Sequence, residues 1–597
     1  MEPQSIVSDR SIAQQELTSP PDMPLPRPDS GSKKSENDVN DPITAEGETQ
    51  DSNNGATVIE FKPTFRFWII LANLSLLIFL ATLENTIIGT ALPFIVDDLD
   101  IGSNYVWVAH IQLLTGTSVL PLTAQLANIF GRRWVTLVIT SLFIVGCVIC
   151  GAATNETMML AGRGIQGIAS QNCVMLTEMI ISDLVPLRER SKYIGMTLSL
   201  SAFSLISGPI ISGAIVQNTS WRWIFYINVP IAGVALIGLY LFLHVKWNRN
   251  ETIMTKVRRI DWVGNIIITG STISILLALT WAHVVHPWDS PEVLAPLIIG
   301  VIGVVAFFVW EARWATEPVI PLRIFKSWSS ILLYIETFMG NFCLFLPAYF
   351  LPLFFQGVMA SSAGRTGVQM IPLTAFMMPS MIFTAIALPK VAKYKGFHVV
   401  GFAILTIGQG IFTMLKREDS NAEWVFKLFA QPLGAGFLVG STLPAIQSWT
   451  TEVDMAAATA GFTYIRGMAM IFGIAIPSTI FNIYISEYSS RIDDLEVRAL
   501  LNAGDAFGLG SKTFVMGYDD PVQSQIRETF QLAIQKAFQA TIAFAGIGFL
   551  LACICRDNRL RSELETFYGL EEKRNKEGRV EEATQMGTMV EKVEGGK

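Results

Sequence analysis

Apolar runs of about 20 residues follow one another from Phe67 to Ile554, separated by short polar segments. A helix of that length crosses the ~30 Å hydrocarbon core of a bilayer. Because helices satisfy their own backbone polar groups in lipid, the pattern predicts an all-α membrane protein. We place fourteen transmembrane helices, near residues 67–92, 105–127, 134–153, 158–182, 192–216, 223–243, 262–282, 293–312, 329–355, 367–388, 398–415, 424–447, 457–485 and 537–555.

Lys and Arg are distributed unevenly between the loops. Loops after even-numbered spans are rich in them, as at 132–133, 188–192 and 246–259, whereas loops after odd-numbered spans carry few. Positive residues in short loops stay on the cytoplasmic side. We therefore expect both tails in the cytoplasm and an outer loop at about 486–536.

The spacing of the spans suggests two six-helix bundles with two helices inserted between them. Large secondary transporters are built from such parallel repeats, and their binding site lies at the midplane between the repeats. The expected divisions are a cytoplasmic N-terminal tail at 1–62, an N-terminal bundle at 63–243, a linker with two inserted helices at 244–328, a C-terminal bundle at 329–555 and a cytoplasmic C-terminal tail at 556–597.

Charge adds a prediction about the N-terminal tail. The net charge of −7 matches that of residues 1–62 alone, which contain twelve Asp or Glu and five Lys or Arg. The segment is rich in Ser and Pro and poor in aromatics, a composition typical of disorder. It has no apolar signal-peptide core, so we expect the first span to direct targeting. We expect the plasma membrane. The vacuolar membrane stays the alternative, because the tails carry no recognisable address that separates the two.

Candidate catalytic chemistry is not apparent in the sequence. The six cysteines lie in apolar runs without zinc-site spacing, which favours packing roles. The histidines are scattered, and no nucleophile–base–acid set or phosphate loop is recognisable. We expect no enzyme activity, cofactor, metal or nucleic-acid partner. We expect a monomer in the lipid bilayer whose partners are protons and a small-molecule substrate.

The run LSLSAFSLISGPIISG at 198–213 combines helix length with a Gly-Pro pair. Proline removes a backbone donor and bends a helix, which neighbouring helices in a membrane tolerate. The small residues allow another helix to approach closely. Taken alone, the run favours an ordinary Pro-kinked membrane helix; with its flanking sequences it indicates a hinge in an active transporter.

Four other stretches accompany this run: LENTIIGTALP at 83–93, QLANIFGRR at 125–133, LAGRGIQG at 160–167 and WRWIFYINVP at 221–230. In chain order, the five stretches resemble motifs of the fourteen-span drug:proton antiporter branch of the major facilitator superfamily, with fungal efflux pumps as the nearest likeness. The run at 198–213 is similar to the fifth-span antiporter motif.

The resemblance implies a major facilitator fold and proton-driven export of small amphipathic compounds, such as a toxin, secondary metabolite or drug, by alternating access. It implies an antiporter hinge at Gly208, Pro209 and Gly213. Alternatives remain a proton-coupled importer, such as a siderophore or basic amino-acid carrier, and a non-transporting membrane sensor.

The loop motif implies a cytoplasmic gate, but it departs from the family pattern, since Asn128 stands where the family usually has an acidic residue. A charge relay to Asp183 then requires Arg132 or Arg133. These arginines also satisfy the positive-inside rule, so gate stabilisation and plain topology both stay open. The predicted gate residues are Asn128, Gly131, Arg132, Arg133 and Asp183.

Charges inside the spans are the strongest functional candidates, because burying them in lipid is costly. Glu84 and Arg163 are expected at similar depth, as proton-coupling residues or as a structural ion pair. Gln166 lies one turn from Arg163 and can hold the guanidinium. Glu336 either lines the substrate cavity or extends to the cytoplasmic surface. Glu178 and Arg466 lie near the cytoplasmic helix ends, which favours a gate or interface role.

Overall fold

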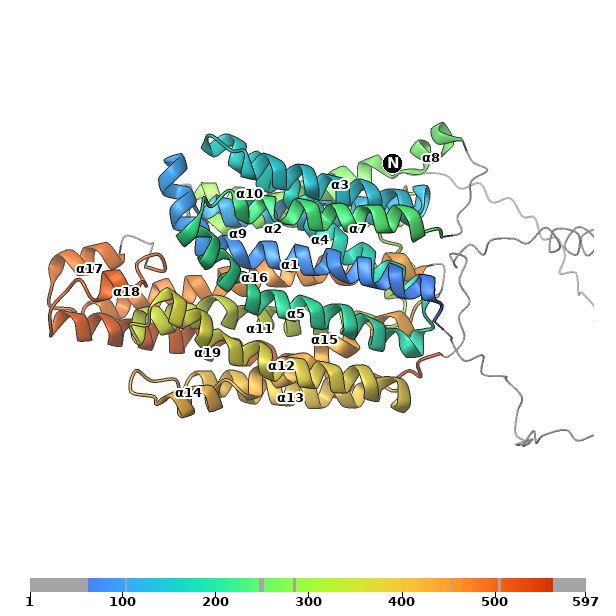
Figure 1. The fold of residues 1–597 in the computed structure, drawn as a ribbon. Coiled ribbons are helices and arrows are strands. Elements are labelled where there is room, and N and C mark those ends of the chain that lie inside the picture. Colours follow the sequence, from blue (N-terminus) through green and yellow to red (C-terminus); the bar gives the residue numbers. More distant parts are fainter. Residues whose placement is uncertain are drawn as a thin grey trace, which may run out of the picture. The chain divides into compact units, whose positions relative to one another are not determined.

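The computed structural model describes residues 63–561 of the 597, apart from 102–104, 246–251, 283–285, 452–453 and 503–505. Predictions about the tails at 1–62 and 562–597 therefore lie outside the described residues. The described part is helical and contains no β-strand, only an isolated bridge between Ala282 and His286. Figure 1 shows the long helices running side by side.

The first half of the fold, here called the N half, contains seven helices. They are α1 (Phe65–Leu99), α2 (Tyr105–Phe130), α3 (Arg132–Gly151), α4 (Glu156–Leu184), α5 (Leu187–Asn218), α6 (Trp223–Tyr226) and α7 (Asn228–Phe242). Three more helices follow before the second half: α8 (Ile253–Arg259), α9 (Trp262–Trp281) and α10 (Pro291–Arg313).

The second half, here called the C half, follows the short 3-10 helix η1 (Leu322–Phe325). It contains α11 (Trp328–Leu353), the π-helical turn η2 (Phe354–Val358), α12 (Ala363–Val391), α13 (Lys395–Phe412), α14 (Asn421–Lys427), α15 (Ala430–Ser448), α16 (Met455–Ser489), α17 (Leu495–Asn502), α18 (Lys512–Val515) and α19 (Val522–Ile554).

Each of the fourteen predicted spans corresponds to a helix or a pair of consecutive helices. Twelve helical segments among the described residues are long and apolar enough to cross a membrane. Helices α4 and α5 are also long, with 29 and 32 residues, but they are more polar. Because α5 packs along α1, and α4 lies between α2 and α3, both fit within the bundle. Their crossing of the membrane remains a prediction.

The helix boundaries follow from local sequence signals. Thr64 caps α1 by accepting a hydrogen bond from the Phe67 amide, and Asn155 caps α4 in the same way. Such side chains replace carbonyl partners that the first turn of a helix lacks. Gly131 separates α2 from α3 with a φ of 88°. That backbone conformation disfavours side chains with a Cβ, which explains glycine at the turn.

The segment expected as an outer loop at 486–536 is largely helical. Helix α16 continues to Ser489, α19 already begins at Val522, and α17 and α18 lie between them. The extension of α19 has a physical reason: Ile526, Phe530 and Ala533 recur at helical spacing and are fully buried. Because this stripe is short and interleaved with Gln, Arg and Glu, hydropathy alone did not reveal it.

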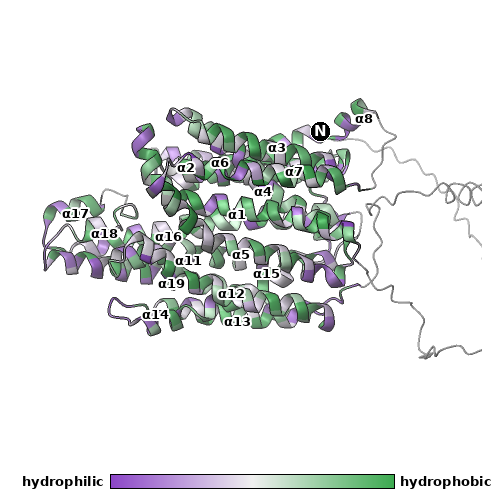
Figure 2. Ribbon diagram, in the orientation of Figure 1, coloured by the Kyte–Doolittle hydropathy of each residue, from purple (hydrophilic) through white to green (hydrophobic). Residues whose placement is uncertain are grey.

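The inserted helices pack beside the N half. Helix α9 contacts α2 and α16, while α10 packs on α9. The outer face of α10 is apolar and exposed, as at Ile298, Ile302 and Val305. An apolar surface of this extent suits contact with lipid. Figure 2 shows the hydrophobic residues along the helices and hydrophilic residues gathered towards their ends.

The largest buried core that the two halves share lies at one end of the bundle. We call this the tail end, because α1 begins and α19 ends there. A single cluster at the tail end combines Leu184 and Tyr193 of the N half with Leu333 and Ile446 of the C half. At the opposite end, here called the far end, buried residues form one cluster within the N half and a separate one within the C half. The tail end is therefore closed between the halves.

Candidate functional site

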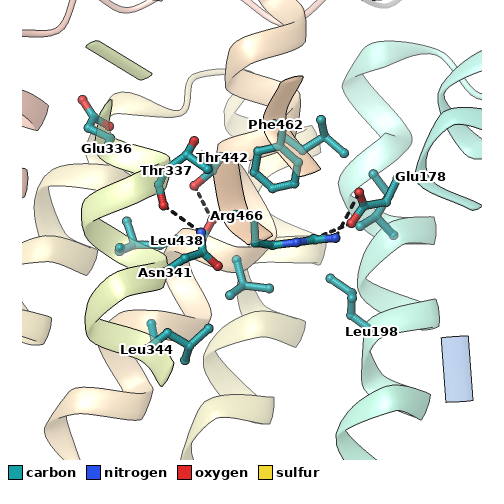
Figure 3. Close-up of a pocket in the computed structure, with 15 residues that line it drawn as sticks. Glu178, Leu198, Glu336, Thr337, Asn341, Leu344, Leu438, Thr442, Phe462 and Arg466 are labelled. Atoms are coloured by element: carbon teal, nitrogen blue, oxygen red, sulfur yellow. Dashed lines mark hydrogen bonds and ion pairs between the residues drawn. The ribbon is translucent and has the colours of Figure 1, made fainter. Parts of the chain in front are cut away.

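A cavity lies between the halves, bordered by α4 and α5 on one side and α11, α15 and α16 on the other. The space between atoms in and around it is about 510 Å3, a volume that includes open solvent. Most of its wall is apolar, and Figure 3 shows several of the polar side chains that interrupt it. The polar side chains are Glu178, Glu336, Thr337, Asn341, Thr442 and Arg466. A mainly apolar wall with few polar groups is typical of small-molecule sites.

An ion pair crosses this cavity from one half to the other. Arg466 of α16 extends to Glu178 of α4, with 2.7 Å between Nη1 and Oε1 (Figure 3). The Thr463 hydroxyl donates a second hydrogen bond to Glu178 at 3.0 Å. The Arg466 side chain is 19% exposed and that of Glu178 is 3% exposed. Both residues therefore hold the halves together at a surface that faces the cavity.

Glu336 lines the cavity, and its side chain is buried rather than extended to the surface. Its Oε2 atom lies 2.6 Å from Nδ1 of His398 on α13. The sequence reasoning passed over His398, because a single histidine in an apolar helix gives no spacing signal. Only the packing of α11 near α13 pairs it with a carboxylate.

Glu84, Arg163 and Gln166 form a second buried network, which lies within the N half rather than at this cavity. Arg163 Nη1 donates to Glu84 Oε1 at 2.7 Å and to Gln166 Oε1 at 2.8 Å. The Asn228 amide donates to Glu84 Oε2 at 2.8 Å, and Arg163 Nε donates to the Val108 carbonyl. Both carboxylate oxygens of Glu84 therefore have partners.

Asn228 was missed as a site residue, although it lies inside the WRWIFYINVP stretch that resembles the family. The residue has no charge, so the search for ionisable groups in spans did not select it. An asparagine amide is costly to bury without a hydrogen-bond partner. An asparagine inside an apolar span was therefore the signal from which Asn228 could have been identified.

The predicted hinge packs directly on this network's helix. A Cβ atom at Gly208 would collide with the Thr86 hydroxyl of α1, two residues from Glu84. The Ser212 hydroxyl donates to the Ile87 carbonyl at 2.9 Å. Helix α5 continues without interruption through positions 208, 209 and 213. The close approach of α5 to α1 thus depends on the absence of a side chain at Gly208.

The predicted gate residues gather at the tail end of the N half, apart from Arg133. Arg132 Nε lies 2.8 Å from Asp183 Oδ2, and Arg132 Nη1 donates to Asn128 Oδ1 at 2.7 Å. Arg133 instead donates to the Tyr240 carbonyl on α7. Of the two arginines considered for a relay to Asp183, the structure therefore selects Arg132. Gly131 provides the turn between α2, which carries Asn128, and α3, which carries Arg132.

A polar seam joins the halves beside this cluster. The Gln447 amide of α15 donates to the Ser182 hydroxyl at 2.8 Å and to the Thr459 hydroxyl at 2.9 Å. Arg190 of α5 donates to Gln447 Oε1 at 2.9 Å. Ser182 directly precedes Asp183, so the Arg132 cluster positions a residue that touches the C half. Sequence reasoning did not find Gln447, which carries no charge and belongs to none of the motifs.

Among the described residues, no group of three or more His, Cys, Asp or Glu side chains is arranged to hold a metal ion. The six cysteines are unpaired. Cys147 accepts a hydrogen bond from the Gln166 amide at 3.1 Å, as part of the Glu84 surroundings.

Comparison with known proteins places this geometry in context. A family model described as Major Facilitator Superfamily matches residues 74–477. The MFS-type transporter TwmF of Talaromyces wortmannii is 40% identical over 86% of this chain and 94% of its own length. The MFS efflux transporter aclA of Aspergillus oryzae is 39% identical over 87% and 95%. The efflux pump FUS6 of Gibberella fujikuroi is 38% identical over 85% and 92%.

Two solved structures share the fold at low sequence identity. The human organic anion transporter MFSD10 matches 81% of this chain and 99% of its own, with a TM-score of 0.54 and 13% identity. The proton:xylose symporter XylE matches 84% and 99%, with a TM-score of 0.53 and 12% identity. At such identities, the likeness concerns the arrangement of helices alone.

Proposed function

Because this chain belongs to the Major Facilitator Superfamily, we propose that it is a secondary transporter that exports small amphipathic organic compounds in exchange for protons. The observation that carries the proposal is the cavity between the halves, which a cross-half ion pair and a shared core close at the tail end. The chain is a multi-pass membrane protein and not an enzyme; we place it in the plasma membrane, as a monomer.

Export is supported by relatives whose names describe efflux pumps and transporters. The cavity wall supports the substrate class, since side chains such as Leu198, Leu438 and Phe462 suit an apolar body. Thr337 and Asn341 add hydrogen-bonding groups for a polar substituent. The fungal relatives also favour a compound such as a toxin, secondary metabolite or drug.

Alternating access is supported by the difference between the two ends. With the tails in the predicted cytoplasmic position, a closed tail end and separate far-end cores describe an outward-facing transporter. The polar contacts that close the tail end, at Arg466 and at Gln447, are local and reversible. Opening the tail end requires these contacts to break. Closing the far end requires the clusters of the two halves there to meet.

Proton coupling is assigned to Glu84 on the strength of its position. A carboxylate that is 1% exposed inside a membrane bundle is costly unless it has a function or a partner. Arg163 compensates the charge of an ionised Glu84 through the contact between Nη1 and Oε1, and displacement of that arginine during opening would allow a proton to replace it. The nearby Gly208 contact with Thr86 would transmit helix movement to this site.

Transport in inside-out plasma-membrane vesicles tests the exporter function. With an acidic lumen, an antiporter accumulates its compound inside as protons leave, and a panel of amphipathic toxins and dyes is screened for this behaviour. Accumulation should collapse when a protonophore removes the gradient. Vesicles from cells that lack the protein provide the control. Movement of a compound outward with the protons would indicate an importer, and absence of all flux would support the sensor alternative.

A further inference from the structure

The C half contains its own buried ionisable pair, and the proposed coupling at Glu84 does not use it. Glu336 of α11 is 2% exposed and His398 of α13 is 1% exposed. Their closest atoms, Oε2 and Nδ1, are 2.6 Å apart. Glu336 belongs to the cavity wall and His398 does not.

Each member of the pair has a second polar atom without a hydrogen-bond partner among the described residues. These atoms are Oε1 of Glu336 and Nε2 of His398, and both are buried. A buried polar atom without a partner costs about 1–3 kcal/mol, so native structures rarely retain one without a reason. Two such atoms on adjacent side chains indicate a site that can exchange a proton with the cavity.

The surroundings offer little to fix the charge of the pair. The Tyr394 ring lies 5.3 Å from the imidazole ring, and the Tyr394 hydroxyl is occupied by the Arg556 carbonyl and the Trp449 indole. The cavity-lining residues of α15 are uncharged, and Arg466 of α16 is engaged by Glu178. Other titratable or charged groups on the elements around the pair include Tyr334 on α11, Lys390 on α12, Lys395 on α13 and Cys555 after α19.

We propose that Glu336 and His398 together form a proton-binding site at the cavity wall of the C half. With neutral imidazole and ionised carboxylate, the pair carries one negative charge. A hydronium ion in the cavity water donates one proton and is left as water; the proton forms an N–H bond on the imidazole or an O–H bond on the carboxyl and makes the pair neutral overall.

This proton site stands independently of transport, but its role in coupling rests on the proposed function. Under that function, the pair is a second loading position, in the half opposite Glu84. Glu336 is one of the residues that line the cavity, so water or a substrate that enters there can displace the proton, whereas Glu84 has its own partners inside the N half.

Infrared difference spectroscopy on the whole protein tests the site without a substrate. Protein carrying 13C-labelled histidine rings is reconstituted in lipid, and spectra are compared between pH 4.5 and pH 9.5. One of the five histidines should titrate together with a carboxylate band. His398→Gln should remove the histidine band, and Glu336→Gln should remove the carboxylate band and displace the histidine titration.

Two variants serve as controls, and neither should change these bands. His110→Gln alters a histidine on α2, and Asp98→Asn alters an exposed carboxylate near the end of α1. Size-exclusion profiles confirm that each variant is folded. The proposal would be overturned if the titrating histidine and carboxylate bands persist in folded His398→Gln and Glu336→Gln proteins. It would also be overturned if the unmodified protein shows neither band. Export with no such titration would reject the site alone, whereas titration without export would reject the proposed function alone.

Discussion

Glu84 and Arg163 are each 1% exposed, whereas the ion pair between Asp98 and Arg222 is 47% and 31% exposed. The same chemistry therefore has different consequences at the two sites. Removing one partner of a buried pair costs roughly 3–5 kcal/mol, because the other charge stays buried and uncompensated. An exposed pair contributes about 0–1 kcal/mol.

We expect Glu84→Gln to abolish proton-driven export and to lower the thermal stability of the purified protein. The double variant with Arg163→Gln should recover stability, because both buried charges are gone, while gradient-driven export stays absent. Melting curves and vesicle transport measure the two effects separately. If the double variant regains gradient-driven export, the pair is structural and the coupling acid lies elsewhere, with Glu336 the next candidate.

Asp98→Asn is the matched control for Glu84→Gln. Hydrogen bonds from Arg222 and Trp221 lower the pKa of Asp98 below its ordinary value of 3.8. A lowered pKa stabilises the folded state above the ordinary value, and this contribution is lost as the pH falls through the lowered value. At neutral pH the free energy of unfolding of the variant should lie within about 1 kcal/mol of that of the unmodified protein. The variant should also keep its transport activity. If Asp98→Asn loses as much stability as Glu84→Gln, burial does not explain the effect of Glu84→Gln.

At the scale of whole elements, the contact between α1 and α5 depends on a glycine. Helices approach closely where a small residue replaces a side chain, and a Cβ at Gly208 would collide with Thr86. Gly233 of α7 is surrounded by open space instead, since a Cβ added there would have no heavy atom within 4 Å.

We expect Gly208→Ala to reduce export while the protein still reaches the membrane. Overpacking of this kind costs about 1–3 kcal/mol, and it separates α5 from the helix that carries Glu84. Gly233→Ala should leave export and abundance unchanged. Surface abundance by quantitative blotting and flux in vesicles check both. Normal flux in well-expressed Gly208→Ala and Gly208→Leu proteins would remove this stretch from the mechanism.

The segment that follows α19 is bound by both halves. The Leu560 amide donates to the Ala392 carbonyl at 3.1 Å, and the Arg188 amide of α5 donates to the Arg561 carbonyl at 3.0 Å. The Asn558 amide donates to the Ser448 carbonyl at 2.7 Å. Leu560 is 3% exposed and belongs to the shared tail-end core. Residues 556–561 thus fasten the closed tail end.

Leu560→Ala should release this segment and make it sensitive to trypsin, which cleaves after its arginines. The lost core contact destabilises the docked segment relative to a detached one, so local opening becomes more frequent. Leu550→Ala provides the control, since Leu550 of α19 is 60% exposed. Equal trypsin cleavage rates for the two variants would show that Leu560 does not hold the segment.

At the scale of the whole molecule, the closed end is the one that carries the chain's described termini. Whether this end faces the cytoplasm depends on the Lys and Arg distribution in the loops. That distribution places residue 508, between α17 and α18, on the opposite side of the membrane from both tails.

Epitope tags check the orientation directly. Tags at either terminus should bind antibody only after cells are permeabilised, whereas a tag inserted at Gly508 should bind it in intact cells. Detection of the N-terminal tag in intact cells would reverse the orientation and, with it, the outward-facing interpretation.

The sequence by itself determined the helical architecture, because the period and length of apolar runs decide membrane helices before any tertiary contact forms. It selected Glu84 and Arg163 for a similar reason, since a charge in an apolar span is unusual wherever the helix packs. The order of the five motifs indicated the family, which the comparisons then established.

Only the tertiary structure decided the pairings. His398 with Glu336, Arg466 with Glu178, and Gln447 with Ser182 join residues that are 62 to 288 positions apart. No local spacing encodes such contacts, because they depend on which helix faces meet. Uncharged Asn228 and Gln447 gained importance only when burial made their amides need partners. The separation of the N-half network from the cavity likewise follows from helix packing and not from depth in the membrane.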